Sequence, residues 1–213
     1  MNIHQFIGRL KLQLRGKNQI VGRNMTPEQT VAFFKKQEKT VLTFYGYAVD
    51  YQKASEPRIT VREILSQHVP RTTLINYGAT QAGMGAVYSV AKSMGFTTTG
   101  IVSTLALEFP GDISPDVDHI CFIADTQWGG KLPDSNELSP TSRAMIACSD
   151  ILVAVGGGEI TRDELLEARA QGKPIQYYPA EVNHTWALKN ARDKELPPPD
   201  SFWGAVHEVF GKS

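Results

Sequence analysis

Ser149-Asp-Ile-Leu-Val-Ala-Val-Gly-Gly-Gly-Glu-Ile-Thr-Arg-Asp-Glu-Leu-Leu-Glu-Ala-Arg169 is the stretch that decides the fold. Ile151 to Val155 is a continuous, mostly β-branched apolar run, which is typical of a strand buried on both faces. Three glycines follow at once. Thr161 then opens a helical pattern, with Glu164 three residues further on as in a capping box. Strand, glycine turn and helix in this order predict a βα unit of a parallel sheet.

The glycine turn of this unit has a binding interpretation and a structural one. Backbone N–H groups at a helix N-terminus attract anions, and residues without a Cβ let a phosphate or ribose come close. A tight connection that binds nothing gives the same pattern, since such turns are common in α/β folds. We expect the ligand site here, with these phosphate-binding residues: Gly156, Gly157, Gly158 and Thr161.

A second stretch, Leu74 to Gly95, has the same order of an apolar strand, a glycine turn and a helix start. Two such turns in one parallel sheet place two helix N-termini at the same edge. Ligands in open α/β sheets bind beyond the carboxyl ends of the strands, which is this edge. The second turn therefore adds further candidate ligand contacts: Asn76, Gly78, Thr80, Gly83 and Gly85.

Length and composition indicate one globular domain with a sizeable core, since 41% of the 213 residues are hydrophobic. The 22 basic and 22 acidic residues cancel, so the total charge implies neither a nucleic acid nor a membrane surface as a partner. No stretch approaches 18 apolar residues, and the histidines form no pair at metal-ligand spacing. We expect no membrane span, no metal and no cofactor. The two cysteines favour buried thiols in a reducing compartment, hence a cytoplasmic protein.

Strands that alternate with helices predict an α/β fold with a doubly wound, mainly parallel sheet of the Rossmann-like type, flanked by helices. The expected strands are 41–45, one starting at 74, 97–103, 119–124, 151–155 and 175–178. Two further helix starts are expected at Thr60 and Asp200. We divide the chain into a basic arm and helix (1–39), a nucleotide-binding domain (40–195) and a C-terminal linker and helix (196–213).

Two segments keep alternative interpretations open. Residues 1–25 hold basic residues and no acid, which fits an arm packed on the domain or on a partner subunit better than a targeting segment. Residues 125–140 read as a long loop, which is either a functional lid or a tolerated surface insertion. Trp128 in this loop either stacks on a base or anchors the loop.

Residues 74–103 resemble the Lonely Guy family, often misnamed lysine decarboxylases. The family's first motif is matched by Tyr77-Gly78, Gly83-Met84-Gly85 and the return from Gly95 to Val102. Its second motif, Pro-Gly-Gly-x-Gly-Thr-x-x-Glu, is matched by Gly156-Gly157, Thr161 and Glu164. The resemblance covers about residues 40–180. It extends to the wider SLOG superfamily of nucleotide-binding Rossmann-like proteins, which includes the DNA-processing protein A and nucleotide sensors of bacterial defence systems.

The resemblance implies a phosphoribohydrolase that cleaves the N-glycosidic bond of a nucleoside 5′-monophosphate, and it implies a homodimer or higher homo-oligomer. By match, the catalytic pair is Arg143 and Glu164. A carboxylate stabilises the positive charge that develops on the ribose or orients the attacking water, and an arginine clamps the phosphate. Each residue also has a structural interpretation, Arg143 as a surface ion-pair partner and Glu164 as a helix cap.

The departures from the family motifs favour a second function, a non-catalytic sensor or carrier of a nucleotide derivative. Val155 replaces the motif proline, and the spacing from Gly157 to Thr161 is one residue longer than in the family. Glu159 stands within the turn, where a carboxylate repels a close phosphate unless it contacts ribose hydroxyls instead. We expect base or ribose contacts from Asn76, Trp128 and Glu159, and a nucleotide or phosphorylated small molecule as the partner. Nucleic acid is the least favoured partner.

Overall fold

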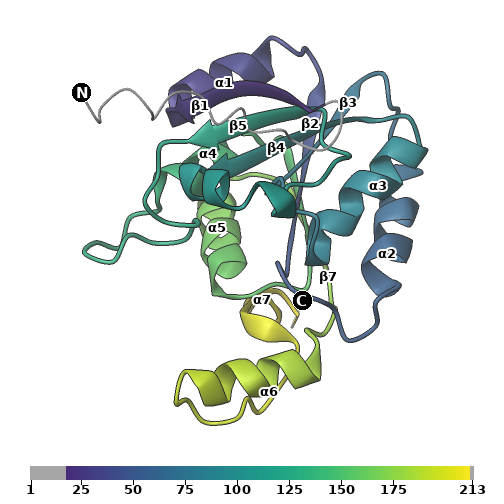
Figure 1. The fold of residues 1–213 in the computed structure, drawn as a ribbon. Coiled ribbons are helices and arrows are strands. Elements are labelled where there is room, and N and C mark those ends of the chain that lie inside the picture. Colours follow the sequence, from purple (N-terminus) through teal and green to yellow (C-terminus); the bar gives the residue numbers. More distant parts are fainter. Residues whose placement is uncertain (1–17, 212–213) are drawn as a thin grey trace, which may run out of the picture.

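The computed structural model of this protein describes residues 18–211. Seven strands in this range form one sheet, in which all neighbouring strands run parallel (Figure 1). Their order across the sheet is β1-β5-β4-β3-β2-β6-β7. The strands are β1 (Gln19–Met25), β2 (Thr40–Gly46), β3 (Thr73–Tyr77), β4 (Thr97–Ser103), β5 (His119–Ile123), β6 (Ile151–Val155) and β7 (Ile175–Tyr178).

Helices cover both faces of the sheet, so the expected doubly wound α/β fold is confirmed. One face carries α2 (Glu56–Leu65) and α3 (Ala86–Ser93). The other carries α1 (Pro27–Lys35), α4 (Pro140–Cys148), α5 (Glu159–Ala170) and α7 (Gly204–Phe210). The side chains that they bury against the strands include Val61, Leu65 and Tyr88 on the first face and Phe34, Ile146, Leu165 and Val206 on the second. Figure 1 shows α6 (His184–Asp193) standing apart from the sheet beside α7.

The sheet reverses its winding direction between β2 and β6. From β2 the chain runs outward through β3, β4 and β5, and it returns to β6 on the other side of β2. The helices after these two strands, α2 and α5, pack on opposite faces. A crevice opens beyond the carboxyl ends of neighbouring strands whose connections leave in opposite directions, and this is where ligands of such sheets bind. The fold therefore places the candidate site next to Gly46 and Val155.

The sequence predicts most element bounds within two residues. The strands at 97–103, 151–155 and 175–178 are confirmed, as is the helix that Thr26 caps, where Thr26 and Gln29 form a capping box. Two helix starts were wrong. Helix α2 begins at Glu56 rather than after Thr60, because Pro57 is accommodated in its first turn. Helix α7 begins at Gly204, not at Asp200.

The expected capping box of α5 was also wrong. The helix begins three residues earlier than this box implies, at Glu159, with Gly158 rather than Thr161 as its N-cap. Thr161 therefore lies inside the first turn, and its hydroxyl points across to the carbonyl oxygen of Gly46, 3.4 Å away. Glu164 is free of the capping role and faces a different neighbour, as described below.

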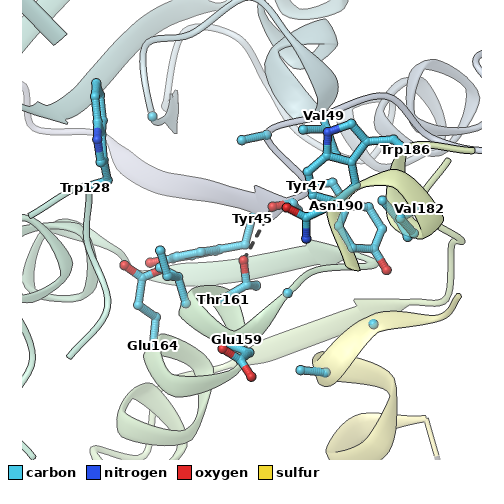
Figure 2. A pocket seen from close by; sticks show the side chains of 18 of the residues that line it. Tyr45, Tyr47, Val49, Trp128, Glu159, Thr161, Glu164, Val182, Trp186 and Asn190 are labelled. Atoms are coloured by element: carbon cyan, nitrogen blue, oxygen red, sulfur yellow. Dashed lines mark hydrogen bonds between the residues drawn. The ribbon is translucent and has the colours of Figure 1, made fainter. Parts of the chain in front are cut away.

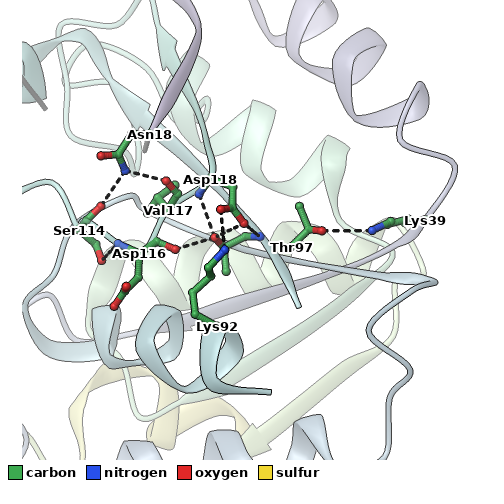
Figure 3. A network of polar contacts seen from close by, with 9 residues as sticks. Asn18, Lys39, Lys92, Thr97, Ser114, Asp116, Val117 and Asp118 are labelled. Atoms are coloured by element: carbon green, nitrogen blue, oxygen red, sulfur yellow. Dashed lines mark hydrogen bonds and ion pairs between the residues drawn. The ribbon is translucent and has the colours of Figure 1, made fainter. Parts of the chain in front are cut away.

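Strand β1 was missed, because its residues were assigned to an N-terminal arm. It is an edge strand with few buried side chains, so it lacks the apolar run that marks the central strands. A polar network anchors its start (Figure 3): the Asn18 amide donates to the carbonyl oxygens of Ser114 (3.1 Å) and Val117 (2.6 Å). Asp118, next along the chain, pairs with Lys92 at 2.6 Å. Residues 1–17, which make up most of the segment considered for targeting, lie outside the described residues.

Candidate functional site

A cavity of about 900 Å³ lies at the carboxyl edge of the sheet, at the β2–β6 switch point. Its size is within the range of roughly 300–1,000 Å³ that is typical of small-molecule sites. The walls come from the ends of β2, β3 and β4, from the first turn of α5, and from the C-terminal segment after β7. All three tryptophans of the chain line it: Trp128, Trp186 and Trp203.

The cavity has two ends, which Figure 2 shows on opposite sides of the view. We call the first the Glu164 end, since Glu164 lies there with Tyr45 and Thr161 below Trp128. The second is the α6 end, where Trp186 and Asn190 of α6 lie together with these residues: Tyr47, Val49 and Val182. Trp128 and Trp186 are 52% and 41% exposed, so each leaves much of its indole uncovered.

Glu164 is a buried carboxylic acid in the cavity wall, with only 5% of its surface exposed. Its Oε1 accepts a hydrogen bond of 2.5 Å from the hydroxyl of Ser142 on α4. The backbone N–H of Gly130 in turn donates to the Ser142 oxygen at 2.7 Å, which ties the 125–139 loop to this pair. Burial raises the pKa of Glu164 from 4.5 to about 7, against the lowering effect of the Ser142 bond, and the neighbouring Asp163 charge raises it further.

Two hydroxyl groups at the Glu164 end are buried without a hydrogen bond to any of residues 18–211. They belong to Tyr45, at 2% exposure, and Thr141, at 5%. The Ser149 hydroxyl lies near the first and the Asp125 carboxylate near the second, both without hydrogen-bond geometry. Glu164 is close enough to Tyr45 that its charge adds to burial in raising the pKa of that phenol. Buried polar groups without partners are uncommon, so this wall has unused hydrogen-bonding capacity.

The C-terminal segment forms the opposite wall, and a buried tyrosine is one of the residues that hold it. The Tyr47 hydroxyl, just beyond β2, donates to the carbonyl oxygen of Trp203 at 2.8 Å and lies 3.2 Å from that of Ala180. These two carbonyls mark the beginning and the end of the excursion that carries α6. Burial raises the pKa of Tyr47 to about 12, so the hydroxyl keeps its proton at neutral pH. Helix α6 itself has no fully buried residue.

The predicted phosphate-binding residues separate into two groups. Those that line the cavity are Gly78, Thr80, Gly158 and Thr161. Those that lie outside its lining are Gly83, Gly85, Gly156 and Gly157. In the second group, the missing Cβ lets other parts of the chain come close to the backbone. A Cβ on Gly156, which has φ of +61°, would lie 2.5 Å from the Tyr47 ring, and one on Gly157 would lie 2.8 Å from Val206.

The three predicted base or ribose contacts also separate. Trp128 and Glu159 line the cavity. Asn76 does not, because its side chain is fully buried within the sheet. There it donates to Thr43 at 3.3 Å and accepts from Thr99 at 3.1 Å. Its amide group is therefore used in hydrogen bonds to the two neighbouring strands.

Arg143 lies apart from Glu164. It is exposed on α4 and lines a second cavity of about 760 Å³, next to Glu28 and Glu167, which does not include Glu164. The catalytic pair implied by the resemblance is therefore not brought together around one cavity. The reason is local: on α4 the adjacent Ser142 faces inward to the carboxylate, so the next residue along the helix points elsewhere.

The charges on the described cavity lining are mainly acidic. Glu159, Glu164 and Glu208 line it, whereas the basic side chains are Lys194 and His207, and no arginine is among them. Within residues 18–211 no group of three or more His, Cys, Asp or Glu side chains could hold a metal ion, and no helix is long and apolar enough to span a membrane. The lining thus lacks the arginine clamp that commonly accompanies phosphate recognition.

Several wall residues were missed at the level of sequence. Tyr45 ends an apolar strand at the carboxyl edge, so its position alone could have identified it. Thr141 and Ser142 open α4, and nothing in their spacing connects them to Glu164. The contribution of α6 and of the segment that follows it depends on how the chain folds back after β7, which leaves no local signal.

No protein-family model matches this sequence, and no curated protein sequence matches it either. Solved structures do match. The molybdenum cofactor binding protein from Rippkaea orientalis has a TM-score of 0.50 and 16% identity, over 78% of this chain and 89% of that one. The molybdenum cofactor carrier protein from Chlamydomonas reinhardtii has a TM-score of 0.47 and 23% identity, over 66% and 76%. The DNA-processing protein A from Streptococcus pneumoniae has a TM-score of 0.46 and 10% identity, over 83% and 62%.

These likenesses concern the fold. The best of the three TM-scores, together with the sheet order and the switch-point cavity, defines a Rossmann-like α/β protein. The Rossmann-like α/β fold expected from the sequence is confirmed at this level.

Proposed function

We propose that this protein binds a nucleotide-like small molecule without transforming it, as a carrier or sensor. The observation that carries the proposal is the cavity of about 900 Å³ at the β2–β6 switch point, which all three tryptophans line and which has a buried carboxyl group at one end. Exposed indole faces offer stacking surfaces for planar rings, at roughly 1–3 kcal/mol per stacked base. Ligand sites commonly combine such apolar surfaces with a few placed polar groups.

Tryptophan fluorescence tests the proposal, because every tryptophan of the chain lines this cavity. The probes are nucleosides, nucleoside monophosphates and the molybdenum cofactor, which the Rippkaea orientalis protein is described as binding. We expect at least one probe to change the emission saturably. Trp128→Leu should weaken that binding by about fivefold or more. Ile59→Ala, which changes an exposed apolar residue on α2 outside the cavity, should leave it unchanged.

The absence of a saturable change with every probe, confirmed by calorimetry, would contradict the carrier or sensor proposal. Equal affinity in Trp128→Leu and the unchanged protein would place the ligand away from the Glu164 end of the cavity.

A phosphoribohydrolase is the second candidate, and Glu164 favours it. A carboxyl group with a pKa near 7 can accept or donate a proton at neutral pH, as general acid–base catalysis requires. The position of Arg143 around another cavity weighs against it. Incubation with a mixture of nucleoside monophosphates, followed by chromatography of the free bases, tests this activity. Base release that Glu164→Gln abolishes would establish the hydrolase, and release equal in both proteins would exclude this carboxyl group as its catalyst.

Self-association as a homodimer or higher oligomer stays a prediction from the resemblance. Sedimentation velocity of the ligand-free protein over a range of concentrations measures it directly.

A further inference from the structure

We propose that the Glu164 end of the cavity recognises a planar heterocycle by an edge with adjacent N–H donors, a ring N–H beside an exocyclic amine, as in guanine. This inference rests on the proposed small-molecule binding and names the class of ring. Three side chains carry it, each more than nine-tenths buried in one wall: Tyr45, Thr141 and Glu164.

The carboxylate of Glu164 has spare acceptor capacity toward the cavity. An ionised carboxylate has about four acceptor positions on its two oxygens. Ser142 donates to Oε1, and Oε2 has no hydrogen-bond partner among residues 18–211. A group that presents two parallel N–H donors fits a carboxylate with both oxygens, in the way that carboxylates accept such donors elsewhere. A ligand edge with only acceptor atoms would bring its lone pairs against those of the carboxylate, and the two would repel each other.

The two unpaired hydroxyls match the rest of such an edge. Tyr45 and Thr141 can each donate one hydrogen bond and accept others, and neither makes one within the described chain. The two N–H groups of guanine would donate to Glu164. Neither hydroxyl oxygen is exposed to the cavity in this structure, so the Tyr45 or Thr141 hydroxyl would have to turn toward the ring to donate to the carbonyl oxygen beside the ring N–H. Adenine presents an acceptor where guanine has its ring N–H, so it matches this wall less well.

The surroundings favour a ring over a phosphate or another anion. Trp128 is half exposed above this end in Figure 2, and Ile160 lies beside Gly129 and Gly130 there. Ile101 and Met145 add further apolar surface to the cavity. Flat aromatic and apolar surfaces cover the faces of a ring while the polar wall meets its edge. The carboxylates of Glu159 and Glu164 repel an anion in this cavity. A ring with N–H donors on its edge fits these surroundings, because its faces can pack on the apolar surfaces and its neutral edge is not repelled by the carboxylates.

Isothermal titration calorimetry with guanosine, inosine and adenosine tests the inference on the intact protein. Inosine keeps the ring N–H of guanosine and lacks its exocyclic amine, whereas adenosine lacks the edge altogether. Because one good bidentate contact discriminates between bases by about 5- to 150-fold, we expect guanosine to bind at least about fivefold more tightly than inosine or adenosine. Glu164→Gln should weaken guanosine binding by about tenfold and leave adenosine binding within about threefold.

The matched control is Glu167→Gln, which changes an exposed glutamate on the same helix and should leave all three affinities unchanged. Adenosine affinity equal to that of guanosine, or a guanosine preference that survives Glu164→Gln, would overturn the ring assignment while the proposed binding function stands. Failure of all three nucleosides to bind the folded protein would overturn the ring assignment too. If another probe of the fluorescence panel still bound, the binding function alone would survive. Circular dichroism and thermal unfolding of each variant verify the fold.

Discussion

Glu164 is the residue in which stability and binding oppose each other. Its burial disfavours the charged form, which is why its pKa rises from 4.5 to about 7. In the unfolded chain the same carboxyl group ionises near its ordinary value. The folded protein therefore binds a proton more tightly than the unfolded chain, and between these two pKa values the folded state loses stability as the pH rises.

The first prediction concerns this loss. Relative to Glu164→Gln, the unchanged protein should lose about 3 kcal/mol of unfolding free energy as the pH rises from about 4.5 to 8, at roughly 1.4 kcal/mol per unit of pKa shift. The contribution is fully present below pH 4.5 and is lost as the pH passes through 7. Urea unfolding of both proteins at pH 5 and pH 8 measures the difference. Glu167→Gln should follow the unchanged protein, and a difference between Glu164→Gln and the unchanged protein that did not vary with pH would contradict a raised pKa.

The second prediction is that guanosine affinity rises with pH, whereas the stability contribution of Glu164 falls. If only the ionised Glu164 accepts both N–H donors, affinity should rise about tenfold between pH 6 and pH 8 and then level off. The titratable neighbours of this carboxyl group are Asp163 on the same helix, Tyr45 on β2 and Tyr77 on β3. Both tyrosines keep their protons throughout because their pKa values are raised. Calorimetry at four pH values measures the profile. Affinity that fell over this range would show that the protonated form of Glu164 binds the ring.

At the scale of elements, the glycine turns explain how the chain closes on itself. Tyr47 packs against the turn after β6, and the first turn of α7 comes close to it: a Cβ on Gly204 would lie 2.5 Å from the Gly157 carbonyl oxygen. Glycine is needed here because a side chain on either turn would occupy the space of a neighbouring backbone. The same residues that suggested a phosphate site therefore fix the wall of the cavity.

A pair of substitutions separates these two roles of glycine. Gly156→Ala should cost about 2–4 kcal/mol of unfolding free energy, since it adds a Cβ against Tyr47 at a backbone φ of +61°. Gly158→Ala adds a Cβ into open space at an ordinary φ and should cost about 1 kcal/mol or less. Thermal and urea unfolding compare the two. Equal costs would mean that the turn is not packed as described.

Tyr47→Phe tests how the C-terminal segment is held. The variant removes the hydroxyl that contacts both ends of the α6 excursion, and it should cost about 1–2 kcal/mol of unfolding free energy. Hydrogen–deuterium exchange should accelerate in residues 180–211 and change little in β3 and β4. Tyr178→Phe, which removes an exposed hydroxyl, is the control. Uniform acceleration over the whole sheet would contradict a local anchoring role.

The sequence predicts the elements well wherever one signal dominates. The strands at 97–103, 151–155 and 175–178 have the expected bounds, because apolar runs between turn residues mark them clearly. It misses β1, since an edge strand with exposed polar residues has no such run. It misplaces the start of α5, because Thr161 and Glu164 match the spacing of a capping box while the N-cap of the helix is Gly158.

The candidate site is less predictable than the fold, for a physical reason. Position along the chain located the carboxyl edge, and with it Gly78, Thr80, Trp128 and Glu164. It could not show that Ser142 rather than Arg143 faces the carboxylate, because that depends on the rotation of α4 against α5. Glycine spacing likewise does not distinguish a turn that admits a ligand from one that admits Tyr47.

At the scale of the whole molecule, the sheet topology and the C-terminal segment together form the cavity. The sheet reverses direction between β2 and β6 and so creates a crevice. The segment after β7 crosses this crevice and turns it into a cavity with a tryptophan at each end. The 125–139 loop, bound through Gly130 to Ser142, completes the Glu164 end. Three parts of the chain, far apart in sequence, thus line one cavity.

The most direct test of this account is native mass spectrometry of the purified protein mixed with guanosine, inosine and adenosine and their 5′-monophosphates. The account predicts one intact guanine-containing ligand per chain, weakened in Glu164→Gln and retained in Glu167→Gln. Release of a free base from the monophosphates, or a protein that takes up none of these molecules while remaining folded, would contradict it.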